Sequence, residues 1–124
     1  MSKKILVIDD EQDVLKAVEF RLKKEGYDVF SAADGKQGFD MLKAISPNLV
    51  LLDLRLPEVD GYELCKAMNA DDALKNIPLI LFTASDPAHI KDNFGELGAD
   101  DYIIKPFEYS ELSTKIKNHI LKNG

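Results

Sequence analysis

Five polar side chains stand where short apolar runs of the sequence end. Asp9 and Asp10 follow "KILVI" (4–8), Asp53 follows "LVLL" (49–52), Thr83 follows "PLILF" (78–82), and Lys105 closes "YIIK" (102–105). Carboxylates held near an apolar core repel one another and are costly to ionise unless a cation accompanies them. The candidate ligands are all oxygens, with no Cys or His at a run's end, so Mg²⁺ or Mn²⁺ is favoured over zinc or copper.

The same set of side chains is matched to a phosphoryl group. A divalent cation and the ammonium group of Lys105 would neutralise phosphoryl oxygens, and the hydroxyl of Thr83 would donate a hydrogen bond to one of them. Asp53 is then the candidate nucleophile that accepts the group. Asp9 or Asp10 taken alone would more often cap the following helix. Taken together with Asp53 and Lys105, they favour a phosphoryl site.

These side chains converge only if the apolar runs are neighbouring strands of one sheet. Helical spacing of apolar residues occurs between the runs, around residues 14–22, 39–45, 64–68, 90–97 and 112–120. With "DVFSA" (28–32) as the second strand, the pattern predicts five strand–helix units, and parallel strands need crossover helices that cover both faces. We therefore expect a doubly wound α/β domain with strand order 2-1-3-4-5 and five helices. Strand two is then an edge, and ligands bind beyond the carboxyl ends of the other strands.

Local residue types agree with this division of the chain. Helix starts are indicated by Asp60 followed by Glu63, and by Asp86 followed by Pro87. Helix ends are indicated by Gly26 and Gly98. "DGKQG" (34–38) lacks the earlier glycine and the Ser/Thr of a phosphate-binding loop, so it predicts another helix start.

Composition narrows the class of protein. A length of 124 residues suits one domain with one core, and the single Cys65 excludes an internal disulfide. A net charge of −6 argues against a nucleic-acid surface, and no apolar stretch is long enough for a membrane span. We expect a soluble, cytoplasmic domain over residues 1–124 with no output domain.

In these motifs the sequence resembles the response-regulator receiver domains of bacterial two-component signalling, including the chemotaxis regulator CheY. The resemblance covers essentially the whole chain and rests on "VIDDEQD", "LLDLRLPEVDG", the "TAS" after the fourth strand, and "GADDYIIKPF". It implies a CheY-like, flavodoxin-like fold and a phosphoacceptor rather than an enzyme, since such a domain catalyses only its own phosphorylation and dephosphorylation.

The resemblance also assigns roles to residues of this chain. Asp53 would form the aspartyl phosphate; Asp10, Asp53 and the backbone carbonyl of Arg55 would bind Mg²⁺ directly, and Asp9 through water. Thr83, Lys105 and the amide of Ala84 would bind phosphoryl oxygens, and the Lys105–Pro106 peptide bond would be cis. Arg55 and Ser85 would tune dephosphorylation.

The resemblance further implies a signalling route. Tyr102 matches the aromatic switch position, and Thr83 would couple phosphorylation to it. The surface formed by the fourth helix, fifth strand and fifth helix, around Ile90, Phe94, Tyr102 and Leu112, would then change. The implied partners are a sensor histidine kinase or phosphotransfer protein, and a downstream protein target or second receiver.

Two other classes remain open on the residues alone. A phosphohydrolase with an aspartyl nucleophile usually carries a second Asp two residues later, where this chain has Arg55. A flavodoxin-like cofactor binder would have a phosphate loop rich in Ser, Thr and Gly after the first strand, and none is present.

Several other residues are interpreted as structural. Cys65 is expected on the core face of its helix, and His89 and His119 on the surface. Lys115, Lys117 and Lys122 are expected to form a solvated face of the last helix.

Overall fold

The backbone forms the expected doubly wound α/β domain. A computed structural model describes residues 2–54, 61–83 and 94–120, with only the backbone described at Thr83. The described elements, in chain order, are β1 (Lys4–Ile8), α1 (Gln12–Lys24), β2 (Asp28–Ala32), α2 (Gly35–Ile45), β3 (Leu49–Leu52), α3 (Gly61–Ala70), β4 (Leu79–Thr83), β5 (Asp101–Ile104) and α5 (Tyr109–Ile120).

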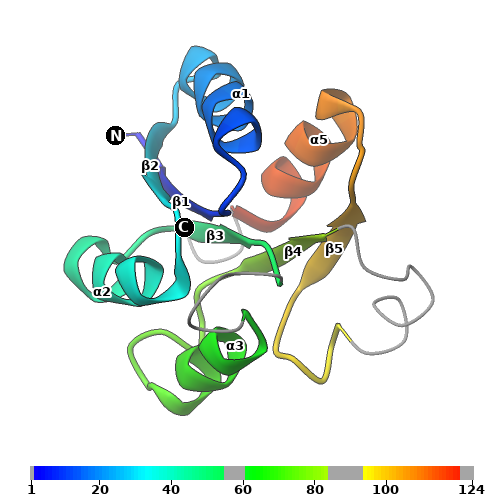
Figure 1. Ribbon diagram of the computed structural model, residues 1–124. Coiled ribbons are helices and arrows are strands. Elements are labelled where there is room, and N and C mark those ends of the chain that lie inside the picture. Colours follow the sequence, from blue (N-terminus) through cyan, green and yellow to red (C-terminus); the bar gives the residue numbers. More distant parts are fainter. Residues whose placement is uncertain (1, 55–60, 84–93, 121–124) are drawn as a thin grey trace.

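The five strands are parallel and follow the order β2-β1-β3-β4-β5, as predicted. α1 and α5 cover one face of the sheet, and α2 and α3 cover the other (Figure 1). Because successive strand side chains point to opposite faces, Leu6 and Ile8 pack toward α2 and α3, while Ile5 and Val7 pack toward α1 and α5. The central strands are therefore apolar on both sides.

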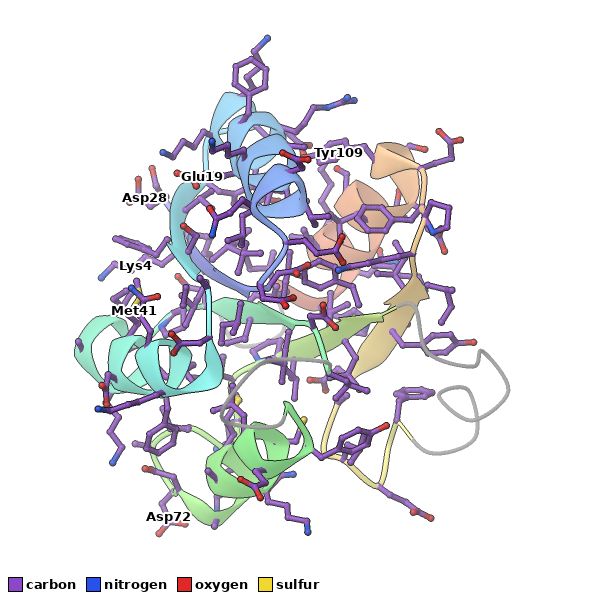
Figure 2. All side chains as sticks on the ribbon, in the orientation of Figure 1. Lys4, Glu19, Asp28, Met41, Asp72 and Tyr109 are labelled. Carbon is purple, nitrogen blue, oxygen red and sulfur yellow. The ribbon has the colours of Figure 1, made fainter. Side chains whose placement is uncertain are left out.

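Two apolar clusters, one on each face, hold the sheet between its helices. Side chains fill the spaces between helices and sheet, whereas charged residues such as Lys4, Glu19 and Asp72 lie at the periphery (Figure 2). Cys65 of α3 is fully buried in the cluster on the face covered by α2 and α3, as expected of a core residue. The core thus fixes the strands, and the strands fix where their carboxyl ends emerge.

The predicted element boundaries hold closely. β1, β2 and β3 match their apolar runs residue for residue, and β4 and β5 are each shifted by one residue. "DGKQG" begins α2, where the Asp34 side chain accepts a hydrogen bond from the Gln37 N–H at 2.7 Å. Gly26 follows the end of α1 at a φ of +97°, a conformation that favours glycine.

The segment expected to form the fourth of five helices is only partly described. Four helices lie in the described residues. Residues 94–98 form turns, and the last of them, Gly98, has a φ of +80°. The expected helix signals at Asp60 and at Asp86 and Pro87, together with Ile90 and His89, lie outside the described residues.

Candidate functional site: an acidic cluster with one lysine

Asp9 leaves β1 directly into the buried end of the sheet. Its N–H donates to the carbonyl of Ala32 at 3.1 Å, which continues the pairing of β1 with β2. Its side chain is fully buried, and Oδ1 accepts a hydrogen bond from the N–H of Glu11 at 2.9 Å. The chain therefore turns back on Asp9 before α1 begins, and this holds one carboxylate oxygen in place.

Asp53 is positioned in the same way at the end of β3. Its N–H donates to the carbonyl of Ile8 at 2.9 Å, so the ends of β1 and β3 are joined. The first residue of α3, Gly61, packs on the backbone beyond it. A Cβ at this glycine would lie 2.6 Å from the Cα of Leu54 and 2.8 Å from the carbonyl oxygen of Asp53. Only glycine allows α3 to start this close to Asp53.

The three carboxylates meet as the sequence predicts. One carboxylate oxygen from each of Asp9, Asp10 and Asp53 lies within 4.8 Å of the others. Asp9 and Asp53 are buried and Asp10 is exposed, so the group opens to solvent on one side. Hard oxygen donors at this separation fit Mg²⁺ or Mn²⁺.

Lys105 enters the same group from the end of β5. Its Nζ lies 2.6 Å from Asp9 Oδ2 and 3.1 Å from Asp53 Oδ2. It also lies 3.0 Å from Glu11 Oε1 and 4.9 Å from the centre of the Phe82 ring. The peptide bond that follows, between Lys105 and Pro106, is cis, as the sequence resemblance implies.

The electrostatics of Asp9 and Lys105 reflect this crowding. Burial, with the nearby charge of Asp53, raises the pKa of Asp9 to about 6, although the hydrogen bond from Lys105 opposes the change. Burial alone would lower the pKa of Lys105, but hydrogen bonds to Asp9 and Glu11 and the charge of Asp53 raise it above its ordinary value. Lys105 is therefore a fixed cation, and Asp9 is a carboxylate that a second cation would stabilise.

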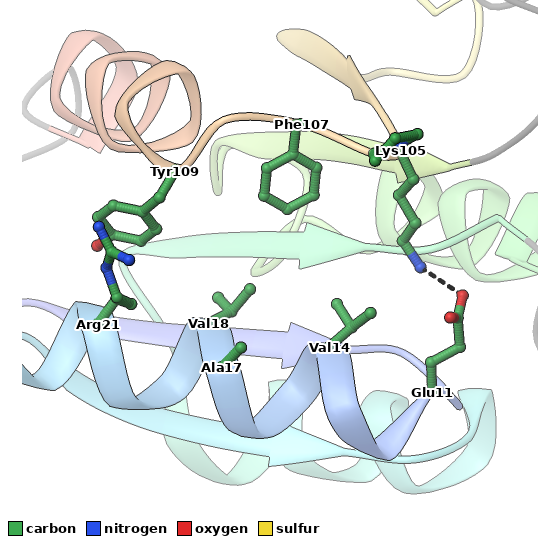
Figure 3. A pocket seen from close by; sticks show the side chains of 9 residues that line it. Glu11, Val14, Ala17, Val18, Arg21, Lys105, Phe107 and Tyr109 are labelled. Atoms are coloured by element: carbon green, nitrogen blue, oxygen red, sulfur yellow. Dashed lines mark hydrogen bonds and ion pairs between the residues drawn. The ribbon is translucent and has the colours of Figure 1, made fainter.

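An apolar groove begins beside this cluster. Glu11 and Lys105 lie together at one end of the groove (Figure 3). This is the end nearest Asp9 and Asp53, and the volume of the groove is about 510 Å³. Its other lining residues come from α1 and the β5–α5 connection, namely Val14, Ala17, Val18, Arg21, Pro106, Phe107 and Tyr109.

Beside this groove, α1 and α5 are joined by a cation–π contact, hydrogen bonds and an ion pair. The Arg21 guanidinium lies 4.4 Å from the centre of the Tyr109 ring, and the Tyr109 hydroxyl donates to Glu25. Ser113 also donates to Glu25 at 2.9 Å, and Lys117 Nζ lies 3.3 Å from the same carboxylate. The sequence analysis did not predict the contacts of Glu25 with α5. It also did not predict the contact between Glu11 and Lys105, although Glu11 directly follows the pair Asp9 and Asp10.

Around Tyr102, the structure corrects two expectations about α5. Lys115 is not a fully solvated side chain: it is 22% exposed, donates to the Tyr102 carbonyl and lies 3.3 Å from Asp101. His119 is not a surface histidine either, being 12% exposed with Nε2 2.9 Å from Asp101. Both face Asp101 because residues four apart share one side of a helix, a spacing that the sequence already displayed. Lys117, at 63% exposed, fits the prediction.

Tyr102, the predicted switch residue, lies half-buried on β5. Its ring centre is 5.2 Å from that of Phe94. The remaining predicted positions, Arg55, Ala84, Ser85, Lys122 and the side chain of Thr83, lie outside the described residues. The structure therefore brings together Asp9, Asp10, Asp53 and Lys105, and places Tyr102 on the fifth strand.

Comparison with known proteins identifies the family. A family model described as "Response regulator receiver domain" matches residues 5–117. The chain belongs to this family. It is thus a receiver domain, a signalling domain of two-component systems, and this favours the receiver over the phosphohydrolase and the flavodoxin-like cofactor binder.

Similar receiver domains have been solved. A CheY-like receiver domain protein from Methanospirillum hungatei is 30% identical, with a TM-score of 0.90 over 100% of both chains. The receiver domain of a sensor histidine kinase from Pseudomonas aeruginosa is 29% identical, with a TM-score of 0.89 over 98% of this chain and 100% of that chain. The latter has a magnesium ion coordinated in its active-site cleft.

A curated relative is longer than this receiver domain. The protein named "Probable transcriptional regulator ycf27" from Porphyridium aerugineum is 44% identical over 115 residues. The match covers 93% of this chain but 47% of that protein, so the chain spans about half of the relative's length. Within the described residues, no helix combines the length and apolar character that a membrane crossing requires.

Proposed function

We propose that this receiver domain accepts a phosphoryl group on Asp53 from a sensor histidine kinase or a phosphotransfer protein. The observation that carries the proposal is the convergence of Asp9, Asp10, Asp53 and Lys105 at the carboxyl ends of three strands. Mg²⁺, or Mn²⁺, would be held directly by Asp10, Asp53 and the carbonyl of Arg55, and by Asp9 through water. Bound there, the cation would offset carboxylate repulsion and neutralise phosphoryl oxygens.

The transfer itself is a displacement at phosphorus. A carboxylate oxygen of Asp53 forms a bond to phosphorus while the bond from phosphorus to the donor's imidazole nitrogen breaks, and the electron pair leaves with the imidazole. Lys105 is already 3.1 Å from Asp53 and remains charged, so it can bind an oxygen of the arriving group. Its present contact with Asp9 can be given up once a divalent cation neutralises that carboxylate.

The remaining roles rest on the family resemblance. Thr83 and the amide of Ala84 would bind phosphoryl oxygens, and Arg55 and Ser85 would tune the attack of water that ends the signal. Movement of the Thr83 hydroxyl toward the phosphoryl group would let Tyr102 turn inward. The surface around Ile90, Phe94 and Tyr102 would then change for a downstream protein or a second receiver. Leu112, which the sequence also placed on this surface, is instead fully buried in the core.

We also propose that residues 1–124 act as one receiver domain in the cytoplasm, where a kinase can supply the phosphoryl group. The domain would catalyse only its own phosphorylation and dephosphorylation.

Intact-mass measurement tests the proposal. Purified protein incubated with acetyl phosphate and Mg²⁺ should gain one phosphoryl group, and the Asp53→Asn variant should gain none. Chelation of the metal with EDTA should prevent the gain in the wild type. Equal modification of Asp53→Asn would remove Asp53 from its role, and equal modification in EDTA would remove the metal from its role.

A further inference from the structure

Glu11 is the acidic residue that lines the groove beside the cluster of Asp9, Asp10, Asp53 and Lys105. Its Oε1 lies 3.0 Å from Lys105 Nζ (Figure 3). The Glu11 side chain is 58% exposed, whereas those of Asp9 and Asp53 are buried. It therefore places a negative charge in solvent beside the cation that an incoming phosphoryl group would contact.

Within residues 2–54, 61–83 and 94–120, the side chain of Glu11 makes no contact that the fold needs. Glu11 is the N-cap residue of α1, yet its carboxylate forms no capping hydrogen bond. The contact that fixes the turn is made by its backbone N–H, which donates to Asp9 Oδ1 at 2.9 Å. Lys105 would keep Asp9 and Asp53 as partners without it. The Glu11 carboxylate therefore affects the charge beside the site more than it affects the structure of the site.

We infer that Glu11 determines donor specificity by disfavouring phosphodonors that carry a high negative charge. The inference rests on the proposed function and adds to it the class of donor. Glu11 lies exposed beside Lys105 at the edge of an already acidic site, so a donor that reaches Lys105 is repelled by its charge, and this repulsion scales with the donor's own charge. A dianionic donor such as acetyl phosphate is therefore disfavoured more than a monoanionic donor.

Two small donors separate this effect from any general change at the site. Acetyl phosphate is a dianion near neutral pH, and it loses acetate when its P–O bond breaks. Phosphoramidate carries a protonated nitrogen and a net single negative charge, and it loses ammonia when its P–N bond breaks. Both deliver the same phosphoryl group to the same oxygen of Asp53, so a difference between them reports on donor charge and leaving group.

The Glu11→Gln variant tests the inference because glutamine keeps the size of the side chain and an oxygen that can accept from Lys105. Second-order rate constants of phosphorylation are measured by intact mass at saturating Mg²⁺, with the Mg²⁺ affinity of each variant determined by calorimetry. The rate constant with acetyl phosphate should rise about threefold, and that with phosphoramidate by less than about twofold. Both increases should shrink at ~1 M salt, where the screening length is about 3 Å.

The matched control is Glu19→Gln, which removes the same charge from the same helix about 12 Å farther along. Glu19 pairs with Lys23 and contacts no residue of the cluster in the structure, so its rate constants should stay at the wild-type values. Equal factors for the two donors, an unchanged rate, or a decrease in Glu11→Gln would overturn the inference while leaving Asp53 as the phosphoacceptor. Failure of the wild type to react with either donor would instead remove the proposed function, and this inference with it.

Discussion

At the scale of single residues, the site holds more negative charge than one lysine can balance. Lys105 lies within 3.1 Å of carboxylate oxygens from Asp9, Glu11 and Asp53, and Asp10 adds a fourth acidic group beside them. This arrangement costs stability when no divalent cation is bound, because buried like charges repel. This cost is the physical reason for proposing that a divalent cation binds here.

The Asp53→Asn variant should therefore be more stable than the wild type in the absence of metal. The amide removes one buried charge but keeps the shape, so we expect the free energy of unfolding to rise by about 1 kcal/mol. Urea denaturation in EDTA measures the change. Mg²⁺ at ~10 times its dissociation constant should then stabilise the wild type by about 1.4 kcal/mol and the variant by much less. Equal stabilisation of both proteins by Mg²⁺ would contradict a shared site.

Asp9 should give the metal-free protein a distinct pH dependence. Its pKa is raised from 3.8 to about 6 in the folded state, chiefly by burial. The folded protein therefore holds this proton more tightly than the unfolded chain. The resulting stability is fully present below about pH 4 and is lost as the pH rises through about 6.

Comparison of wild type with Asp9→Asn isolates this contribution. In EDTA, the free energy of unfolding of the wild type minus that of the variant should fall by about 2–3 kcal/mol between pH 4 and pH 7. Urea denaturation at a series of pH values measures it. A difference that stays flat over this range would show that Asp9 has an ordinary pKa in the folded state.

At the scale of elements, α3 is what fixes the backbone beyond Asp53. Substitution of Gly61 by alanine would force the start of the helix away from Leu54, since a Cβ would lie 2.6 Å from its Cα. We expect Gly61→Ala to lower the free energy of unfolding by about 2 kcal/mol and to slow phosphorylation.

Gly95→Ala is the control, because a Cβ there would meet nothing within 4 Å. Urea denaturation and the rate of reaction with acetyl phosphate should both stay near the wild-type values for this variant. If Gly61→Ala behaves like Gly95→Ala, the close approach of α3 to the Asp53 backbone does not position the phosphoacceptor.

The end of α1 is joined to α5 through Glu25. Burial would raise the pKa of this carboxylate, but hydrogen bonds from Tyr109, Ser113 and Lys117 lower it below its ordinary value. The folded state therefore favours the ionised form, and its stabilising effect is present above about pH 4.5 and is lost as the pH falls through the folded pKa.

Substitution of Glu25 by glutamine should lower the free energy of unfolding by about 1 kcal/mol at pH 7, because three donors lose a charged acceptor. The deficit should shrink in acid, because the stability that the Glu25 charge contributes is lost once the pH falls below the ordinary pKa of about 4.5 and through the lower folded pKa. Thermal or urea unfolding at pH 7 and pH 3 measures both effects, and Glu19→Gln provides a control at an exposed ion pair on the same helix. A deficit that does not depend on pH would show that the charge of Glu25 is not what joins the helices.

At the scale of the whole molecule, the sequence predicted the fold and most of the described site because each strand end is marked by its own chemistry. A buried run that stops at Asp9, Asp53 or Lys105 gives both the strand and its carboxyl end, and parallel pairing brings those ends together. The positions of Lys115 and His119 were not predicted, because helical spacing alone does not say which face of α5 meets β5. Glu11 was missed because an exposed acid after an acidic pair resembles an ordinary helix start.

The central claim is that Asp53 carries the phosphoryl group. The most direct measurement is to phosphorylate the protein with acetyl phosphate and Mg²⁺, reduce the acyl phosphate with borohydride, and sequence the peptides by mass spectrometry. Reduction converts a phosphorylated aspartate to homoserine, so we expect homoserine at position 53 and aspartate retained at Asp9 and Asp10. Homoserine at either of those two positions, with Asp53 unchanged, would contradict it.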